Sequence, residues 1–271
     1  MKDVTVVIRC RNDPRVFDCV ESAEDEAEIM VSISPGDALQ GELESRGVPF
    51  CVSPPGNLSV TSNAGIEASR TEKVIVTDSD TVLGEGTASA MSQALDAHMV
   101  CRARLVFELS EGLALSGPVS RARDFVNSKR LAFTPGLGLR KGLRDSVGGM
   151  LFDEAAPFAV DANLNFRIDR AGVEVLYLDD FTVTHRAESV KHDLKAANRI
   201  GNGVARSSRS LHGMYGGEIP EPEIRRSLKA VHMGDYPDIV RMHGLSTAAY
   251  QAVWDLSFYL GEASFLIGGG R

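Results

Sequence analysis

Two aspartates follow an apolar run in the stretch KVIVTDSDTVL, with a single serine between them. The run before Asp78 and Asp80 is rich in the β-branched residues of a buried strand. Two carboxylates this close repel each other unless a cation or water separates them. The pair therefore has two interpretations: a solvated turn, or a site for a hard divalent cation such as Mg²⁺ or Mn²⁺.

Two residues of the second half could complete such a site. His185 ends the run FTVTH, where its imidazole is either a third metal ligand or an ordinary structural side chain. Asp161 begins the stretch VDANLNFRIDRAG, where it either stabilises the N-terminus of a helix or acts as a general base facing a hydroxyl group. For each residue taken alone, the structural interpretation is the simpler one.

The elements that must position these residues alternate along the first half of the chain. Apolar runs predict strands over 4–8, 28–33, 48–52 and 73–77. Helical spacing predicts helices over 15–23, 37–47 and 58–70, with Gly47 after the second helix and Ser59 or Thr61 capping the third. This alternation predicts an α/β fold with a mostly parallel central sheet flanked by helices. Ligands of such folds bind at the carboxyl ends of the strands, which is where Asp78 and Asp80 lie.

The character of the chain changes near residue 187. Before it we expect a helix over 86–97, a strand over 98–109, a loop-rich stretch over 110–147, a helix over 160–172, and strands over 173–178 and 181–186. After it the chain is largely helical, with a break over 213–223 and a last apolar helix over 248–270. We therefore expect an α/β domain over 1–186, which carries the candidate site residues, and a helical C-terminal extension over 187–271.

Composition and absent motifs narrow the class of protein. The formal charge of −8 argues against a nucleic-acid binder. The four cysteines form no CxxC pair, and neither a signal peptide nor a run of about 18 apolar residues is present, so we expect a cytoplasmic protein. No dinucleotide fingerprint, GxSxG elbow or Walker A loop occurs. The last helix either packs on the main domain, contacts the inner face of a membrane or pairs subunits.

Several motifs occur in a fixed order. VVIRCRND ends the first strand, and SNAGIEASR, VTDSD, GGMLFDE, VDANLNFRIDRAG and a strand ending in THR follow it. In this order and spacing the chain resembles the inverting family 2 glycosyltransferases, which share the GT-A fold. The resemblance covers residues 4–186, about two thirds of the chain.

The resemblance implies a hexosyltransferase-type enzyme that moves a sugar from a nucleotide-diphosphate sugar, expected to be a UDP-sugar, to an acceptor hydroxyl. It implies that Asp80 binds Mn²⁺ or Mg²⁺ together with His185, with Asp78 in the metal shell or against the ribose. It also implies that Asp161 deprotonates the acceptor. Further donor contacts are expected from Asn12, Arg11, Asp37, Asn63, Gly148 and Gly149, with Arg9 as the alternative to Arg11 for a phosphate or base contact.

The chain departs from the family pattern at three positions. Val160 replaces the usual glutamate, Asn163 replaces a common aspartate, and Ser62 replaces a frequent arginine. In addition, the second strand ends in SISPGD in place of a frequent acidic motif, so Asp37 is a shifted substitute for the usual contact with the uracil base. A catalytically degenerate nucleotide-sugar-binding module is therefore one alternative. A sugar nucleotidyltransferase is another, although RCRNDPRVF lacks the glycines of the phosphate loop in those enzymes.

Overall fold

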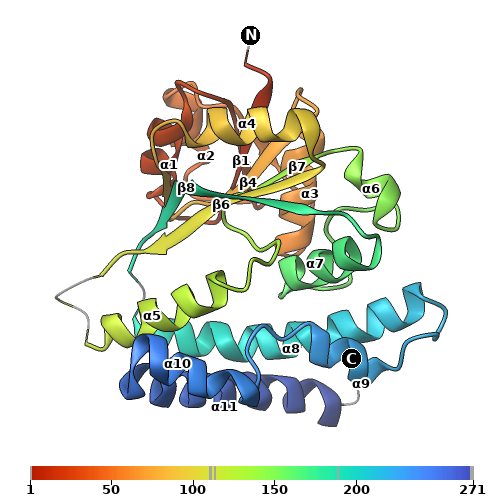
Figure 1. Ribbon diagram of the computed structural model, residues 1–271. Helices are drawn as coiled ribbons and strands as arrows, with labels where there is room; N and C mark the ends of the chain where they lie inside the picture. The colour runs from red at the N-terminus through yellow and green to blue at the C-terminus, as the bar shows by residue number, and fades with distance from the viewer. Residues whose placement is uncertain (1, 110–111, 113, 188, 269–271) are drawn as a thin grey trace. The chain divides into compact units, whose positions relative to one another are not determined.

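The computed structural model describes residues 2–109, 112, 114–187 and 189–268 (Figure 1). The chain divides into two compact units. The first contains residues 1–106, 131–154 and 167–185, and the second contains residues 107–130, 155–166 and 186–271. Two segments that the sequence groups with the first domain, 107–130 and 155–166, thus cluster with the C-terminal helices.

The first unit is built on an eight-stranded sheet. Its strands are β1 (Val4–Cys10), β2 (Glu28–Ile33), β3 (Phe50–Val52), β4 (Lys73–Asp78), β5 (Thr81–Leu83), β6 (Val100–Phe107), β7 (Leu137–Arg140) and β8 (Val175–His185), in the order β3-β2-β1-β4-β7-β6-β8-β5. Strands β3, β2, β1 and β4 are parallel, whereas β7 is antiparallel to β4 and β6, and β5 is antiparallel to β8. The predicted α/β fold with a parallel core is confirmed.

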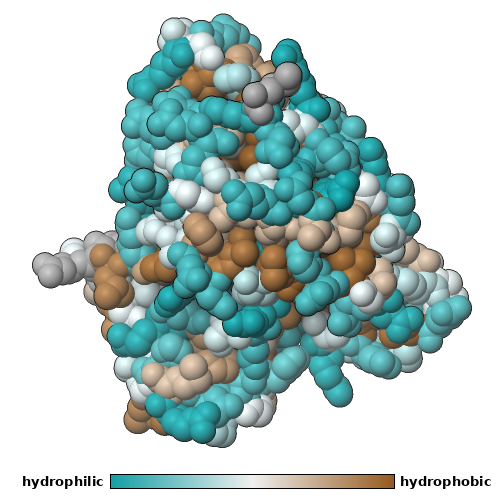
Figure 2. Space-filling view, turned by 45° about the horizontal axis from the view of Figure 1, so that its top comes forward, coloured by the Kyte–Doolittle hydropathy of each residue, from teal (hydrophilic) through white to brown (hydrophobic). Residues whose placement is uncertain are grey.

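Helices cover the strands of this unit and explain why their runs are continuously apolar. They are α1 (Val16–Ala23), α2 (Gln40–Ser45), α3 (Leu58–Ala68), α4 (Thr87–Ala97) and α6 (Leu143–Ser146). Every residue of β1 is buried, as expected of a central strand covered on both faces. A Cβ on Gly65 would lie 2.5 Å from Cγ1 of Val7, so this glycine lets α3 approach the sheet. The outer surface in the view of Figure 2 is mostly hydrophilic.

Three local predictions are wrong. The side chain of Asn57 caps α3, in place of Ser59 or Thr61. The segments 173–178 and 181–186 form one strand, β8, because exposed positions in a strand tolerate the acidic pair between them. The stretch 110–147 contains a helix, α5 (Ser116–Asn127), and two further elements, β7 and α6.

The second unit is helical in its described residues, as predicted for the C-terminal region. With α5 it contains α8 (Val190–Met214), α9 (Glu221–Ser227), α10 (Tyr236–His243), α11 (Leu245–Ile267) and a 3-10 turn over Met233–Asp235; α7 (Val160–Arg170) begins in this unit and ends in the first. The helix predicted over 248–270 is α11, and residues 269 and 270 lie outside the described residues. No described helix is both long and apolar enough to cross a bilayer.

Helices α8 and α11 lie side by side and cross closely at two glycines (Figure 1). A Cβ on Gly201 would lie 1.9 Å from the carbonyl oxygen of Phe258, and a Cβ on Gly261 would lie 1.9 Å from the carbonyl oxygen of Asn198. Both neighbours are main-chain atoms, which cannot move aside as a flexible side chain can. The contact between the two helices therefore requires glycine at both positions.

Gly261→Ala is expected to destabilise the protein by about 3 kcal/mol, because its methyl group would force the two helices apart. Gly213→Ala is the matched control: it lies in α8 with no atom within 4 Å of its Cβ, so it should stabilise the protein by up to about 1 kcal/mol. Urea unfolding of both variants measures the difference. Equal stability of the two variants would contradict the close crossing.

Candidate active site

Asp78 is held by an arginine from the neighbouring strand. Parallel pairing of β1 and β4 places Arg9 opposite Asp78, and Nη2 of Arg9 lies 2.7 Å from Oδ1 of Asp78. The same Nη2 donates a hydrogen bond of 3.0 Å to Oγ1 of Thr134. The positive charge that compensates Asp78 in this structure is therefore a guanidinium group.

The guanidinium of Arg9 is deeply buried, with only 4% of the residue exposed. Its Nε and Nη1 find no hydrogen-bond acceptor among the described residues. A buried charge is stable only when it is paired and well hydrogen-bonded. Arg9 therefore depends on Asp78 and Thr134 for its partners.

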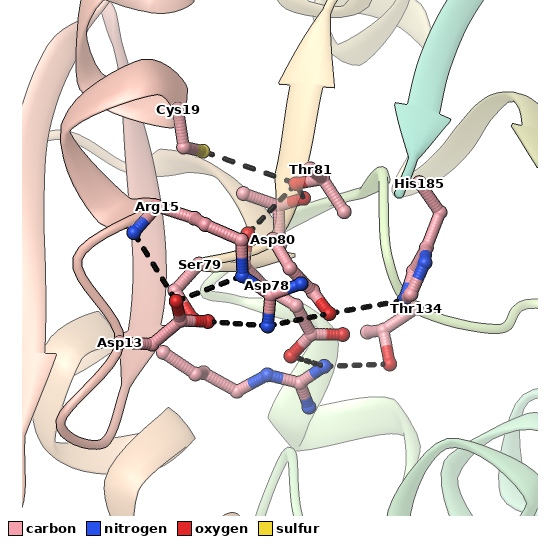
Figure 3. A network of polar contacts seen from close by, with 11 residues as sticks. Asp13, Arg15, Cys19, Asp78, Ser79, Asp80, Thr81, Thr134 and His185 are labelled. Atoms are coloured by element: carbon pink, nitrogen blue, oxygen red, sulfur yellow. Dashed lines mark hydrogen bonds and ion pairs between the residues drawn. The ribbon is translucent and has the colours of Figure 1, made fainter. Parts of the chain in front are cut away.

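Asp80 lies in the turn between β4 and β5, where it faces two basic side chains (Figure 3). Its Oδ2 is 3.5 Å from Nε2 of His185 and 3.5 Å from Nη2 of Arg15. Antiparallel pairing of β5 with β8 sets Thr81 opposite His185, and this pairing brings the imidazole to the turn. Burial raises the pKa of Asp80, the charge of Asp78 raises it further, and His185 and Arg15 oppose the rise.

The loop after β1 is tied to the same turn. The guanidinium of Arg15 donates two hydrogen bonds to Asp13, of 2.8 and 2.9 Å, and Oγ of Ser79 donates one of 2.8 Å to the same carboxylate (Figure 3). Burial acts to raise the pKa of Asp13, but the hydrogen bonds from Arg15 and Ser79 outweigh it, so this pKa is lowered. We call Arg9, Asp13, Arg15, Asp78, Asp80 and His185 the charged cluster.

The sequence analysis did not single out three residues at this site. Asp13 and Arg15 could have been found, because the loop RCRNDPR places arginines around an aspartate directly after the first strand. Thr134 could not, because it precedes β7 in a stretch that the sequence predicts to be rich in loops, with no motif around this residue. The cluster therefore depends on pairings between segments far apart in the chain.

A divalent cation would fit between Asp80 and His185. Among the described residues, no group of three or more His, Cys, Asp or Glu side chains converges on a metal position. Mg²⁺ binds oxygen at about 2.1 Å, so two neighbouring ligand atoms lie roughly 3 Å apart, close to the 3.5 Å between Oδ2 of Asp80 and Nε2 of His185. Mg²⁺ is usually bound through one or two carboxylates and completes its shell with phosphate and water, so Asp80 is the main protein ligand that this site offers. Asp78, the third predicted ligand, carries Arg9 on one oxygen instead.

Asn12 and Asp37 join the loops that follow β1 and β2. The main-chain N–H of Asn12 donates to Asp37 at 2.8 Å, and the side-chain oxygen of Asn12 accepts from the N–H of Ala38 at 2.7 Å. Asn12 adopts a positive φ of 52°, which asparagine tolerates better than most residues. Arg11 beside them is exposed. The structure brings Asn12 and Asp37 together, and the donor-binding roles of all three residues stay predictions.

A buried arginine holds the main chain of residues 147–151, which we call the glycine segment. Gly148 and Gly149 have φ values of 94° and 83°, a conformation that side chains rarely adopt. Nη1 of Arg167 donates to the carbonyls of residues 147 and 150, at 2.8 and 2.6 Å, and Nη2 donates to the carbonyl of residue 151. Arg167 is fully buried and was not predicted as a site residue.

Asn63 fixes the other end of this segment. Its amide nitrogen donates to the carbonyl of Phe152 at 2.9 Å and to Glu154 at 3.0 Å, and its oxygen accepts from the N–H of Phe152 at 3.2 Å. These contacts give Asn63 a positioning role for the glycine segment. Its predicted contact with a donor stays a prediction.

Asp161, the predicted base, lies in the first turn of α7, where its Oδ1 accepts from the N–H of Ala162 at 2.9 Å. It belongs to the second unit and is not part of the charged cluster, so its role stays a prediction. Its neighbours Val160 and Asn163, at which the chain departs from the family pattern, are both buried. The side chains of Val160 and Asn163 therefore belong to the buried core.

No protein-family model and no curated protein matches the chain. Two solved structures of S. aureus TarS, residues 1–349, match 99% of this chain and 92% of their own, with 14% identity. Their TM-scores are 0.53 and 0.51, and the second structure is a complex with UDP-GlcNAc. The chain has the fold of TarS. This likeness to TarS confirms the predicted GT-A fold with its helical C-terminal region.

Proposed function

We propose that this protein is an inverting, metal-dependent glycosyltransferase of family 2. It would move a sugar from a nucleotide-diphosphate sugar, expected to be a UDP-sugar, to an acceptor hydroxyl. The ordered motifs and the fold shared with TarS, one structure of which holds UDP-GlcNAc, support this proposal. The observation that carries it is the approach of Asp80 and His185 to 3.5 Å beside the carboxyl end of β4.

The charged cluster has the chemistry that a sugar diphosphate requires. Asp80 and His185 would hold Mn²⁺ or Mg²⁺, and the cation would stabilise the charge that develops on the leaving diphosphate. Arg15, 3.5 Å from Asp80, adds a second positive charge beside the same position. Arg9 neutralises the charge of Asp78, so Asp78 repels an anionic donor less than an unpaired carboxylate would. Asp78 is accordingly expected to position the turn or contact the ribose.

Asp161→Asn is expected to lower donor turnover about 10²- to 10⁴-fold, because the variant cannot accept the proton of the acceptor or of an attacking water. The affinity for the donor should change little. UDP release from UDP-GlcNAc with Mn²⁺ measures turnover, and calorimetry measures binding. Asp169→Asn, an exposed site on the same helix, is the matched control. A parallel loss of binding and turnover would remove Asp161 from the role of base.

A degenerate nucleotide-sugar-binding module is the second candidate, and the observation that favours it is the buried Val160 in place of the family glutamate. It predicts donor binding without turnover for any acceptor. A sugar nucleotidyltransferase would instead release pyrophosphate from a sugar 1-phosphate and a nucleoside triphosphate. Assays of UDP release and pyrophosphate release on the same preparation separate the three functions.

A further inference from the structure

One face of α11 exposes apolar side chains along its whole length. Leu245, Val253, Leu256, Leu260 and Ile267 are between 51% and 85% exposed. Successive members are 8, 3, 4 and 7 residues apart, which are sums of steps of three and four, so they lie on one side of the helix, with Ala249 and Ala263 between them. We call these seven residues the apolar face.

The apolar face carries no charge. Helix α11 contains no Lys or Arg, and its two acidic residues are engaged elsewhere. Asp255 is buried and pairs with Lys229 at 3.2 Å, and Glu262 pairs with Arg225 at 3.3 Å. A surface helix of a soluble domain normally shows charged residues to water, so a helix that is apolar on both sides indicates a surface covered by a partner.

The neighbouring helix α8 carries a row of positive charges. Lys191, Lys195, Arg199, Arg206 and Arg209 recur at spacings that place them on one side of the helix, and all but Arg206 are exposed. The acidic residue in α8, Asp193, is buried and accepts a hydrogen bond from the hydroxyl of Tyr250. We call these five basic residues the basic stripe, which stands out in a chain of net charge −8.

The basic stripe and the apolar face share a border. The amide of Asn198, three residues after Lys195, donates to the carbonyl of Ser257 at 3.2 Å, and Ser257 is three residues before Leu260. At the other end of the contact, the guanidinium groups of Arg206 and Arg209 each lie 4.8 Å from the ring centroid of Phe265 in α11. The two helices therefore present one continuous surface, apolar on α11 and positive on α8.

We propose that this surface docks on a bilayer that contains anionic lipids. A helix binds in the membrane interface when its exposed apolar side chains enter the acyl region and neighbouring lysines and arginines contact the anionic headgroups. A second copy of the chain fits less well, because the same surface of a partner copy offers no exposed negative charge to pair with the basic stripe. A soluble polyanion would use the basic stripe and leave the apolar face exposed.

Co-sedimentation with vesicles tests the proposal. The full chain should sediment with vesicles of phosphatidylcholine and phosphatidylglycerol, weakly with phosphatidylcholine alone, and less at high salt. Lys191→Gln with Lys195→Gln should weaken binding about fivefold per charge. Leu256→Ser with Leu260→Ser should also reduce binding at least about tenfold. All four side chains are exposed, so the melting temperature should not change.

Two controls and three contrary results make the test decisive. Arg241→Gln and Val52→Ser change an exposed basic and an exposed apolar residue outside the surface and should bind as the unchanged protein does. Absence of sedimentation with anionic vesicles would overturn the proposal. So would a concentration-dependent dimer that the Leu256 and Leu260 variant abolishes, because a second copy would then cover the apolar face. The third contrary result is vesicle binding that the leucine substitutions leave unchanged and that soluble polyphosphate fully displaces. The basic stripe would then bind a soluble polyanion, and the apolar face would have no part in it.

Discussion

Asp80→Asn is expected to lower nucleotide-sugar turnover at least about 100-fold, because the neutral amide is a poor ligand for Mn²⁺ or Mg²⁺. The loss should come with weaker cation-dependent binding of the donor. UDP release and calorimetry with Mn²⁺ measure the two effects. Asp25→Asn removes one exposed acidic charge outside the cluster and serves as the control, with turnover expected to be unchanged.

The pKa of Asp80 adds a pH dependence with a defined sign. Burial raises this pKa above that of an ordinary aspartate, so turnover should fall as the pH drops through the raised value. For stability the sign is opposite. A carboxyl whose pKa is raised by folding favours the folded state when protonated, and this contribution is lost as the pH rises through the raised pKa. At neutral pH, Asp80→Asn should therefore keep or raise the melting temperature, and a marked fall would indicate a structural role instead.

Asp78→Ala is expected to destabilise the protein by about 3 kcal/mol, because it leaves the buried guanidinium of Arg9 without its carboxylate. In a chain of this size that loss lowers the melting temperature by roughly 10 °C. Thermal and urea unfolding measure it. Arg9 would retain only Thr134 as a hydrogen-bond acceptor among the described residues.

A double variant separates the lost ion pair from other effects of the substitution. Arg9→Met combined with Asp78→Ala removes both charges, so it should recover most of the stability that Asp78→Ala loses. If Asp78→Ala alone costs less than about 1 kcal/mol, the ion pair between Arg9 and Asp78 contributes no more than an exposed one, and Asp78 is not needed to stabilise the buried guanidinium.

The strands of the first unit could be predicted because covered parallel strands are apolar throughout. The runs at 4–8 and 73–77 became β1 and β4, and the rule that ligands bind at carboxyl ends of strands pointed to Asp78 and Asp80. The position of His185 at the end of a strand was also predicted. These predictions needed only local pattern and the order of elements.

The partners of the acidic residues could not be predicted in the same way. Arg9 lies opposite Asp78 because of the register between β1 and β4, and a sequence does not reveal the register of strands whose paired residues are 69 positions apart. The grouping of 107–130 and 155–166 with the C-terminal helices also depends on long-range packing. Asn63 was expected to contact a donor, and only the fold shows that its amide holds the segment from Phe152 to Glu154.

Calorimetric titration with UDP-GlcNAc and other nucleotide sugars, with and without Mn²⁺, shows whether the protein binds a sugar donor through a cation. We predict that at least one nucleotide-diphosphate sugar binds and that its binding requires the cation. Asp80→Asn and His185→Ala should each abolish the cation-dependent binding. Absence of binding for every donor with Mn²⁺ and Mg²⁺, or equal affinity in the Asp80→Asn variant, would contradict this prediction.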